Sequence, residues 1–286
     1  MKNTHYNLIH ILIVLILISA CTQKVEQRNL SLATPEEVGM SAERLERLTQ
    51  AMQNEINEVN TPGITTMIAR HGKIVHFETY GYQDIENQIP IDKNTIFRIY
   101  SMTKPVTGVA LMMLYEEGKF HLSDPVSKYI PEFKGMKVVE NYYDRNPKLV
   151  DAEHEMTIRE IMSHSAGFSY GIFGNTHVDS LYLDADVLNY HSSLKEMAMS
   201  LSQIPLLYQP GKGYFYSISV DVQSYLVEVL SGISFRDFLQ ERIFTPLNMV
   251  DTDFWVPKEK MERFAEVYDR KKGEDLKLCK EVVGLD

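Results

Sequence analysis

The sequence predicts a mixed α/β protein of the α+β type, in which an antiparallel sheet accompanies a helical region. Two β-rich runs, Ile64–Ala69 and Lys73–Tyr80, are joined at His71-Gly72, which is a hairpin signal. Farther along, Val106–Leu114 and Val220–Leu230 are apolar runs of helical length. Such runs indicate helices that are buried in a core.

The first residues indicate export. Residues 1–20 contain Lys2 and an apolar run, Leu8–Ile18, which is too short to span a membrane comfortably. Small residues precede Cys21, a pattern that resembles the bacterial lipoprotein signal. We expect a signal peptide over 1–20, a lipid anchor at Cys21 that holds the protein on the periplasmic or extracellular face of the cell envelope, and a polar tether over 21–33. A plain signal peptide or a membrane anchor is the alternative.

The remaining helices are expected from apolar spacing and from capping residues. Ser41 is placed to cap the first helix, and Thr157 with Glu160 forms a possible capping pair for a short one. Residues 134–155 are charged and predict an exposed, irregular segment, and residues 168–192 show no clear period. The expected helices span 34–53, 101–118, 156–162, 193–202, 220–230, 235–243 and 258–266.

Composition limits the classes of partner. The net charge of −10 and the lack of a basic stripe argue against nucleic acid. The nine histidines do not show metal-ligand spacing, and the two cysteines, Cys21 and Cys279, are far apart. We expect no cofactor and no metal.

The strongest chemical signal is Ser101-Met102-Thr103-Lys104, an S-x-x-K pattern at the start of a predicted apolar helix. Side chains three residues apart share one face of a helix. A serine hydroxyl is a poor nucleophile until a base takes its proton, and a lysine shielded from water can take or relay that proton. The simpler interpretation is a capping serine beside a solvated lysine.

Two further segments come after that pattern along the chain. They are His164-Ser165-Ala166-Gly167, and Pro210-Gly211 followed by Tyr216-Ser217. In their order and spacing, residues 34–268 resemble the serine β-lactamase-related family, which includes class C β-lactamases, D,D-peptidases and β-lactamase-like esterases. The resemblance implies a β-lactamase/transpeptidase-like fold with the site between the sheet and the helical region.

The resemblance also implies roles for individual residues. Ser101 would be the acylated nucleophile, Lys104 would share its proton, and Tyr216 would act as the base. Ser217 and Ser219 are weaker candidates for substrate contact. His164 is expected to be structural, a residue that ends a helix and packs near the site. The implied reaction is acyl transfer to Ser101 followed by hydrolysis.

The chain departs from the family pattern at two places. Where the family has Y-S-N, this chain has Tyr216-Ser217-Ile218, so no amide is offered to a substrate there. The family's third motif is K-T-G or H-x-G, whereas the only K-x-G downstream in this chain is Lys271-Lys272-Gly273, set among charges. We therefore expect a hydrolase domain over 34–286 that lacks its C-terminal strands. A small carboxylic ester is preferred as substrate over a β-lactam or a D-Ala-type peptide.

Two other interpretations compete with this one. Gly167-Phe168-Ser169-Tyr170-Gly171 matches G-x-S-x-G, the nucleophile elbow of α/β-hydrolases, which would make Ser169 the nucleophile of an esterase. That elbow requires a strand before the serine, whereas the sequence predicts a helix there. The other possibility is a non-catalytic lipoprotein of the cell envelope with a degenerate or truncated hydrolase fold.

Overall fold

The computed structural model describes residues 30–271 and 274–279. The predicted signal peptide, the lipidation site Cys21 and most of the tether lie outside the described residues, as do Lys272 and Gly273. Within the described part of the chain, no helix has both the length and the apolar character needed to cross a membrane.

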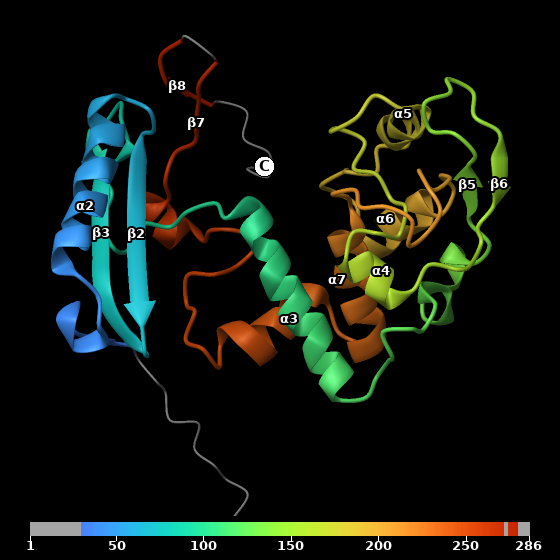
Figure 1. The fold of residues 1–286 in the computed structure, drawn as a ribbon, viewed down its shortest axis with the longest axis horizontal. Helices are drawn as coiled ribbons and strands as arrows, with labels where there is room; N and C mark the ends of the chain where they lie inside the picture. The colour runs from blue at the N-terminus through green and yellow to red at the C-terminus, as the bar shows by residue number, and fades with distance from the viewer. Residues whose placement is uncertain (1–29, 272–273, 280–286) are drawn as a thin grey trace, which may run out of the picture. The chain divides into compact units, whose positions relative to one another are not determined.

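Contacts between residues divide the chain into two units. The first contains the described residues up to Tyr82 together with Pro90–Lys93, and the second contains Gln83–Ile89 together with the described residues from Asn94 onward. Helices and strands occur in both units, which confirms the predicted mixture of α and β structure (Figure 1).

The first unit is built on a small sheet. Its elements are β1 (Ser31–Leu32), α2 (Ala42–Asn57), β2 (Gly63–Arg70), β3 (Lys73–Asp84) and β4 (Ile89–Pro90). The strand order is β1-β3-β2, with β2 antiparallel and β1 parallel to β3, and β4 also pairs with β3. The predicted hairpin is confirmed: His71 and Gly72 have φ values of 53° and 73°, the left-handed conformation that a tight hairpin turn uses.

Helix α2 begins later than the sequence suggested. Residues Glu36–Val38 form the separate 3₁₀ turn η1, which ends at Gly39 with φ 70°. Ser41 then caps α2 by accepting a hydrogen bond from the Arg44 N–H at 3.3 Å. The expectation of one helix from residue 34 was wrong because the left-handed glycine interrupts it.

The second unit is mainly helical, with α7 at its centre. Helix α7 packs against α3, α4 and α6 (Figure 1), and it also contacts α8. Leu111, Leu114, Ile161, Leu201 and Leu226 in these helices are at most 1% exposed. Burying each such side chain contributes about 1.5–3 kcal/mol. The elements are, in order, η2 (Tyr100–Met102), α3 (Thr103–Glu116), η3 (Val126–Lys128), η4 (Pro131–Phe133), β5 (Lys137–Val139), β6 (Leu149–Asp151), α4 (Ile158–Met162), α5 (His177–Asp184), α6 (Leu194–Leu201), α7 (Ser219–Ser231), α8 (Phe235–Leu239), η5 (Gln240–Phe244), η6 (Lys258–Arg263), β7 (Tyr268–Asp269) and β8 (Lys277–Leu278).

Two segments of this unit contain regular structure that the sequence did not indicate. Residues 134–155 are not irregular throughout, because β5 and β6 form an antiparallel hairpin in which Val138 is buried. Residues 168–192 contain α5, whose start is fixed by a reciprocal capping box between Thr176 and Asp179.

The other predicted helices are present with small changes at their ends. The capping box of Thr157 and Glu160 starts α4 as expected, and Gly232, with φ 80°, closes α7. The helix expected over 235–243 divides into α8 and the π-helical turn η5, and the last expected helix is the 3₁₀ helix η6.

Candidate functional site

Ser101 and Lys104 lie at the entrance to α3. Ser101 is in the 3₁₀ turn η2, and α3 continues from Thr103 into the core. The spacing of three residues brings Lys104 Nζ to 3.1 Å from Ser101 Oγ, within hydrogen-bonding distance. Ser101 is exposed and Lys104 is half-buried. The hydroxyl is therefore accessible to a ligand while the amine is partly shielded.

Tyr216 reaches the same serine from a distant part of the sequence. Its hydroxyl lies 2.6 Å from Ser101 Oγ, and the two residues are separated by 115 positions in the chain. Lys104 Nζ also lies 4.7 Å from the centre of the Tyr216 ring. The structure therefore brings together the three residues for which the sequence predicted catalytic roles, and all three belong to the second unit.

The electrostatics at Tyr216 favour its ionised form. Burial raises the pKa of Tyr216, but hydrogen bonds with Lys104 and Ser101 and the charge of Lys104 together outweigh burial. The pKa of Tyr216 therefore lies below its ordinary value. A phenolate beside Ser101 Oγ can accept the serine proton.

A cavity of about 570 Å³ opens beside these groups. Ser101, Lys104, Tyr170 and Asp221 are among the residues that line it. Burial raises the pKa of Asp221, and burial followed by the charge of Asp221 raises the pKa of Tyr170 to about 12. Tyr170 therefore stays a neutral phenol at neutral pH, and its ring stacks almost parallel to Tyr216 with centroids 5.8 Å apart.

Two residues of the site, Tyr170 and Asp221, were not predicted from the sequence. Tyr170 lies within the G-x-S-x-G match, where its position carried no signal of its own. Asp221 could have been noticed, because it is the acidic residue in the first turn of the predominantly buried helix α7.

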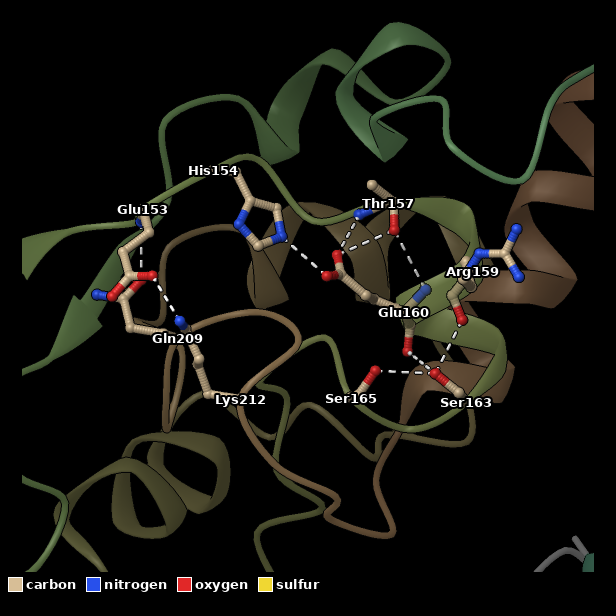
Figure 2. A network of polar contacts seen from close by, with 9 residues as sticks. All are labelled: Glu153, His154, Thr157, Arg159, Glu160, Ser163, Ser165, Gln209 and Lys212. Carbon is tan, nitrogen blue, oxygen red and sulfur yellow. Dashed lines mark hydrogen bonds and ion pairs between the residues drawn. The ribbon is translucent and has the colours of Figure 1, made fainter.

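The turn that leads to Tyr216 is attached to the segment before α4. Figure 2 shows the polar network that makes this attachment. The Glu153 N–H donates to Gln209 Oε1 at 2.8 Å, and the Glu153 carboxylate pairs with Lys212 Nζ at 3.0 Å. Beside them, His154 Nε2 lies 2.8 Å from Glu160 Oε1 (Figure 2). These contacts fix residues 209–212, from which the chain continues to Tyr216.

The alternative nucleophile, Ser169, has no access to solvent. It is 0% exposed, and its hydroxyl donates to the Asp179 carboxylate. The element before it is helix α4, not the strand that a nucleophile elbow requires. Ser169 therefore does not lie in a nucleophile elbow, and the interpretation that makes it the nucleophile of an esterase is wrong.

Ser217 and Ser219 are also buried. They are 1% and 0% exposed, and their hydroxyls lie 2.8 Å apart. Neither residue lines the cavity beside Ser101. Because both hydroxyls are buried, they are not accessible to a substrate, contrary to the expectation from the sequence for Ser217 and Ser219.

The position of the family's asparagine is occupied by Ile218, which is 1% exposed. Its side chain belongs to the hydrophobic core, and its N–H donates to the Ser169 carbonyl at 3.1 Å. This position therefore offers no polar group to a ligand. Among residues 30–271 and 274–279, no three or more His, Cys, Asp or Glu side chains cluster in a way that could hold a metal ion.

Comparisons with known proteins show a family model and relatives that the chain is similar to. A family model described as Beta-lactamase matches residues 45–282. Protein Rv1367c of Mycobacterium tuberculosis is 30% identical over 206 residues, which cover 72% of this chain and 51% of the relative. Esterase EstB of Burkholderia gladioli is 29% identical over 225 residues, which cover 78% of this chain and 54% of the esterase. The chain thus spans about half the length of these two relatives.

The chain is also similar in fold to a solved structure. The structure described as EstCE1, a hydrolase with promiscuous acyltransferase activity, superposes with a TM-score of 0.71 at 25% identity. The match covers 83% of this chain and 59% of that one.

Proposed function

The chain belongs to the Beta-lactamase family, and we propose that it acts as a serine hydrolase that forms an acyl-enzyme on Ser101. One observation supports this most directly. Ser101 Oγ lies 2.6 Å from the Tyr216 hydroxyl and 3.1 Å from Lys104 Nζ. Serine needs such neighbours, because its hydroxyl is a weak nucleophile until a base takes the proton.

The proposed reaction has two halves. In the first, the Tyr216 phenolate takes the proton of Ser101, Oγ bonds to the carbonyl carbon of the substrate, and the leaving oxygen departs with the proton from Tyr216. In the second, Tyr216 takes a proton from water, the resulting hydroxide attacks the acyl carbon, and the bond to Oγ breaks as Ser101 regains that proton from Tyr216, which leaves the phenolate again. Lys104 lowers the pKa of Tyr216 and so favours the ionised form from which each half starts.

We propose a small carboxylic ester as the substrate class. The buried Ile218 stands where the family pattern has an asparagine, so a substrate amide loses a partner that an ester does not need. The likeness to an esterase of Burkholderia gladioli supports the same preference. Hydrolysis of p-nitrophenyl butyrate should therefore exceed hydrolysis of the β-lactam nitrocefin under the same conditions.

Covalent labelling of the folded protein tests the proposal. A fluorescent fluorophosphonate should attach to Ser101, as located by mass spectrometry of the digested protein. Ser101→Ala should abolish both labelling and ester hydrolysis. Ser169→Ala is the matched control, because Ser169 is buried and should not react. If Ser101→Ala retains labelling and hydrolysis, the assignment of the nucleophile is wrong. A folded wild-type protein that neither reacts nor hydrolyses the ester would favour a non-catalytic binder.

A further inference from the structure

His164, which follows the C-cap residue of α4, contacts the chain on both sides of Tyr216. Its φ of 55° lies in the left-handed region, which is uncommon for residues other than glycine. The His164 carbonyl accepts hydrogen bonds from the Phe215 N–H at 3.0 Å and from the Tyr208 hydroxyl at 3.1 Å. The main chain of His164 thus fixes the residue before Tyr216.

The imidazole of the same residue fixes Ser217, on the other side of Tyr216. The Ser217 N–H donates to His164 Nδ1 at 3.1 Å, and Ser217 Oγ lies 3.2 Å from the same nitrogen. Between these contacts the imidazole stacks on the Tyr216 ring, with centroids 5.1 Å apart and planes 28° from parallel. His164 therefore contacts Phe215, Tyr216 and Ser217 in succession.

These contacts determine the protonation of the imidazole. A backbone N–H can only donate, so Nδ1 must carry its lone pair and the ring proton must be on Nε2. Burial, followed by the charge of Lys104, lowers the pKa of His164, which agrees with a neutral ring. The groups that face the imidazole are Lys104 from α3 and Tyr214 and Tyr216 from the segment before α7.

We propose that His164, as a neutral imidazole, is a positioning residue that holds the Tyr216 hydroxyl within reach of Ser101. The inference rests on the proposed function, because it assigns importance to the position of Tyr216. Protonation of the ring would replace the Nδ1 lone pair by N–H, so the hydrogen bond from the Ser217 N–H would be lost. It would also place a second positive charge near Lys104. Activity therefore depends on His164 remaining neutral.

Three variants test the proposal in assays of p-nitrophenyl butyrate hydrolysis across pH. His164→Phe keeps an aromatic ring but offers no acceptor to Ser217. It should lower kcat by about 10²-fold, the effect of a misplacement of roughly 1 Å, with little change in KM. His164→Asn tolerates the left-handed backbone and offers an amide oxygen, so it should recover part of kcat. His121→Asn, at an exposed loop position, is the control.

The pH profile separates positioning from simple packing. In the wild type, protonation of Tyr216 lowers kcat toward acid, and kcat should fall more steeply where the pH drops through a second pKa below about 6.5, the ordinary histidine value. His164→Asn should lack that second step, whereas His121→Asn should retain it. If folded His164→Phe keeps the wild-type kcat, or if His164→Asn keeps the second step, the proposal is overturned. Should His164→Phe fail to fold, the profile of His164→Asn decides alone.

A measurement that does not need activity distinguishes this inference from the proposed function. Long-range ¹H–¹⁵N correlation spectra of the full chain, with ¹⁵N-labelled histidine, should show His164 as the neutral Nε2–H tautomer at pH 7. Its titration midpoint should lie below about 6.5. A proton on Nδ1, or a midpoint above that value, overturns the role of His164 even if Ser101 is labelled. A wild-type protein that is inert toward the ester refutes the proposed function instead.

Discussion

Replacing Tyr216 by phenylalanine removes one oxygen atom from the site and keeps the ring. The oxygen is the one that lies 2.6 Å from Ser101 Oγ. The ring's contacts with His164 and Tyr170, at centroid distances of 5.1 and 5.8 Å, do not involve it. Because one hydrogen bond contributes about 0.5–1.5 kcal/mol to stability, the free energy of unfolding should change by about 1 kcal/mol or less.

The effect on the reaction should be much larger. A positioned general base contributes about 10²–10⁴-fold to a rate. At about 1.4 kcal/mol for each tenfold change, this corresponds to roughly 3–5 kcal/mol of transition-state stabilisation. We therefore expect Tyr216→Phe to lower kcat/KM for p-nitrophenyl butyrate by at least about 10²-fold. The rate of fluorophosphonate labelling at Ser101 should fall in parallel.

The control is Tyr143→Phe, which removes the same atom from a side chain that is 79% exposed on the segment between β5 and β6. It should leave kcat/KM and the labelling rate unchanged. Urea unfolding of both variants should give free energies close to that of the wild type. If Tyr216→Phe is stable and labels Ser101 at the wild-type rate, some other group takes the serine proton and the mechanism must be abandoned.

Three further predictions concern charge, backbone and lipid. Lys104→Met removes the hydrogen bond and the charge that lower the pKa of Tyr216. The pH at which kcat/KM rises should therefore move to a higher value. A pH profile identical to that of the wild type would contradict this. Gly167→Ala should destabilise the protein by about 2–4 kcal/mol in urea unfolding, because φ is 93° and a Cβ would lie 2.4 Å from the Tyr208 carbonyl oxygen. Gly118→Ala, with φ 70° and open space, should lose only about 1 kcal/mol, and equal losses would refute the steric argument. We also propose that Cys21 is lipidated: bacteria expressing the chain should incorporate labelled palmitate into the wild type but not into Cys21→Ala, and an unlabelled wild type would exclude the anchor.

The sequence predicted those parts of the fold that depend on interactions between residues close together in the chain. The left-handed conformation at His71 and Gly72 specified the hairpin, and the capping pair of Thr157 and Glu160 specified the start of α4. Helix α5 was missed because polar and apolar residues mix along it and its capping pair, Thr176 with Asp179, was not recognised. The strands β5 and β6 were missed because each has three residues, too few for an alternating pattern.

The site was predictable only in part. The S-x-x-K spacing places Lys104 beside Ser101 on one helix face, so local geometry sufficed for that pair. Local geometry could not bring Tyr216 to Ser101, and only the resemblance to a family suggested that contact. The burial of Ser217 and the contacts of His164 arise from packing between distant segments, which a single sequence does not display.

The rings stacked around Tyr216 have a consequence for configurational entropy. The ring centroids of His164 and Tyr170 both lie within 6 Å of the Tyr216 ring centre, with planes 28° and 6° from parallel, which restricts how far the phenol can tilt. Rotation of the ring about its long axis leaves the hydroxyl in place. The conformational entropy of the Tyr216 side chain is therefore lost when the protein folds. Little further conformational entropy has to be lost by this side chain when a substrate reacts.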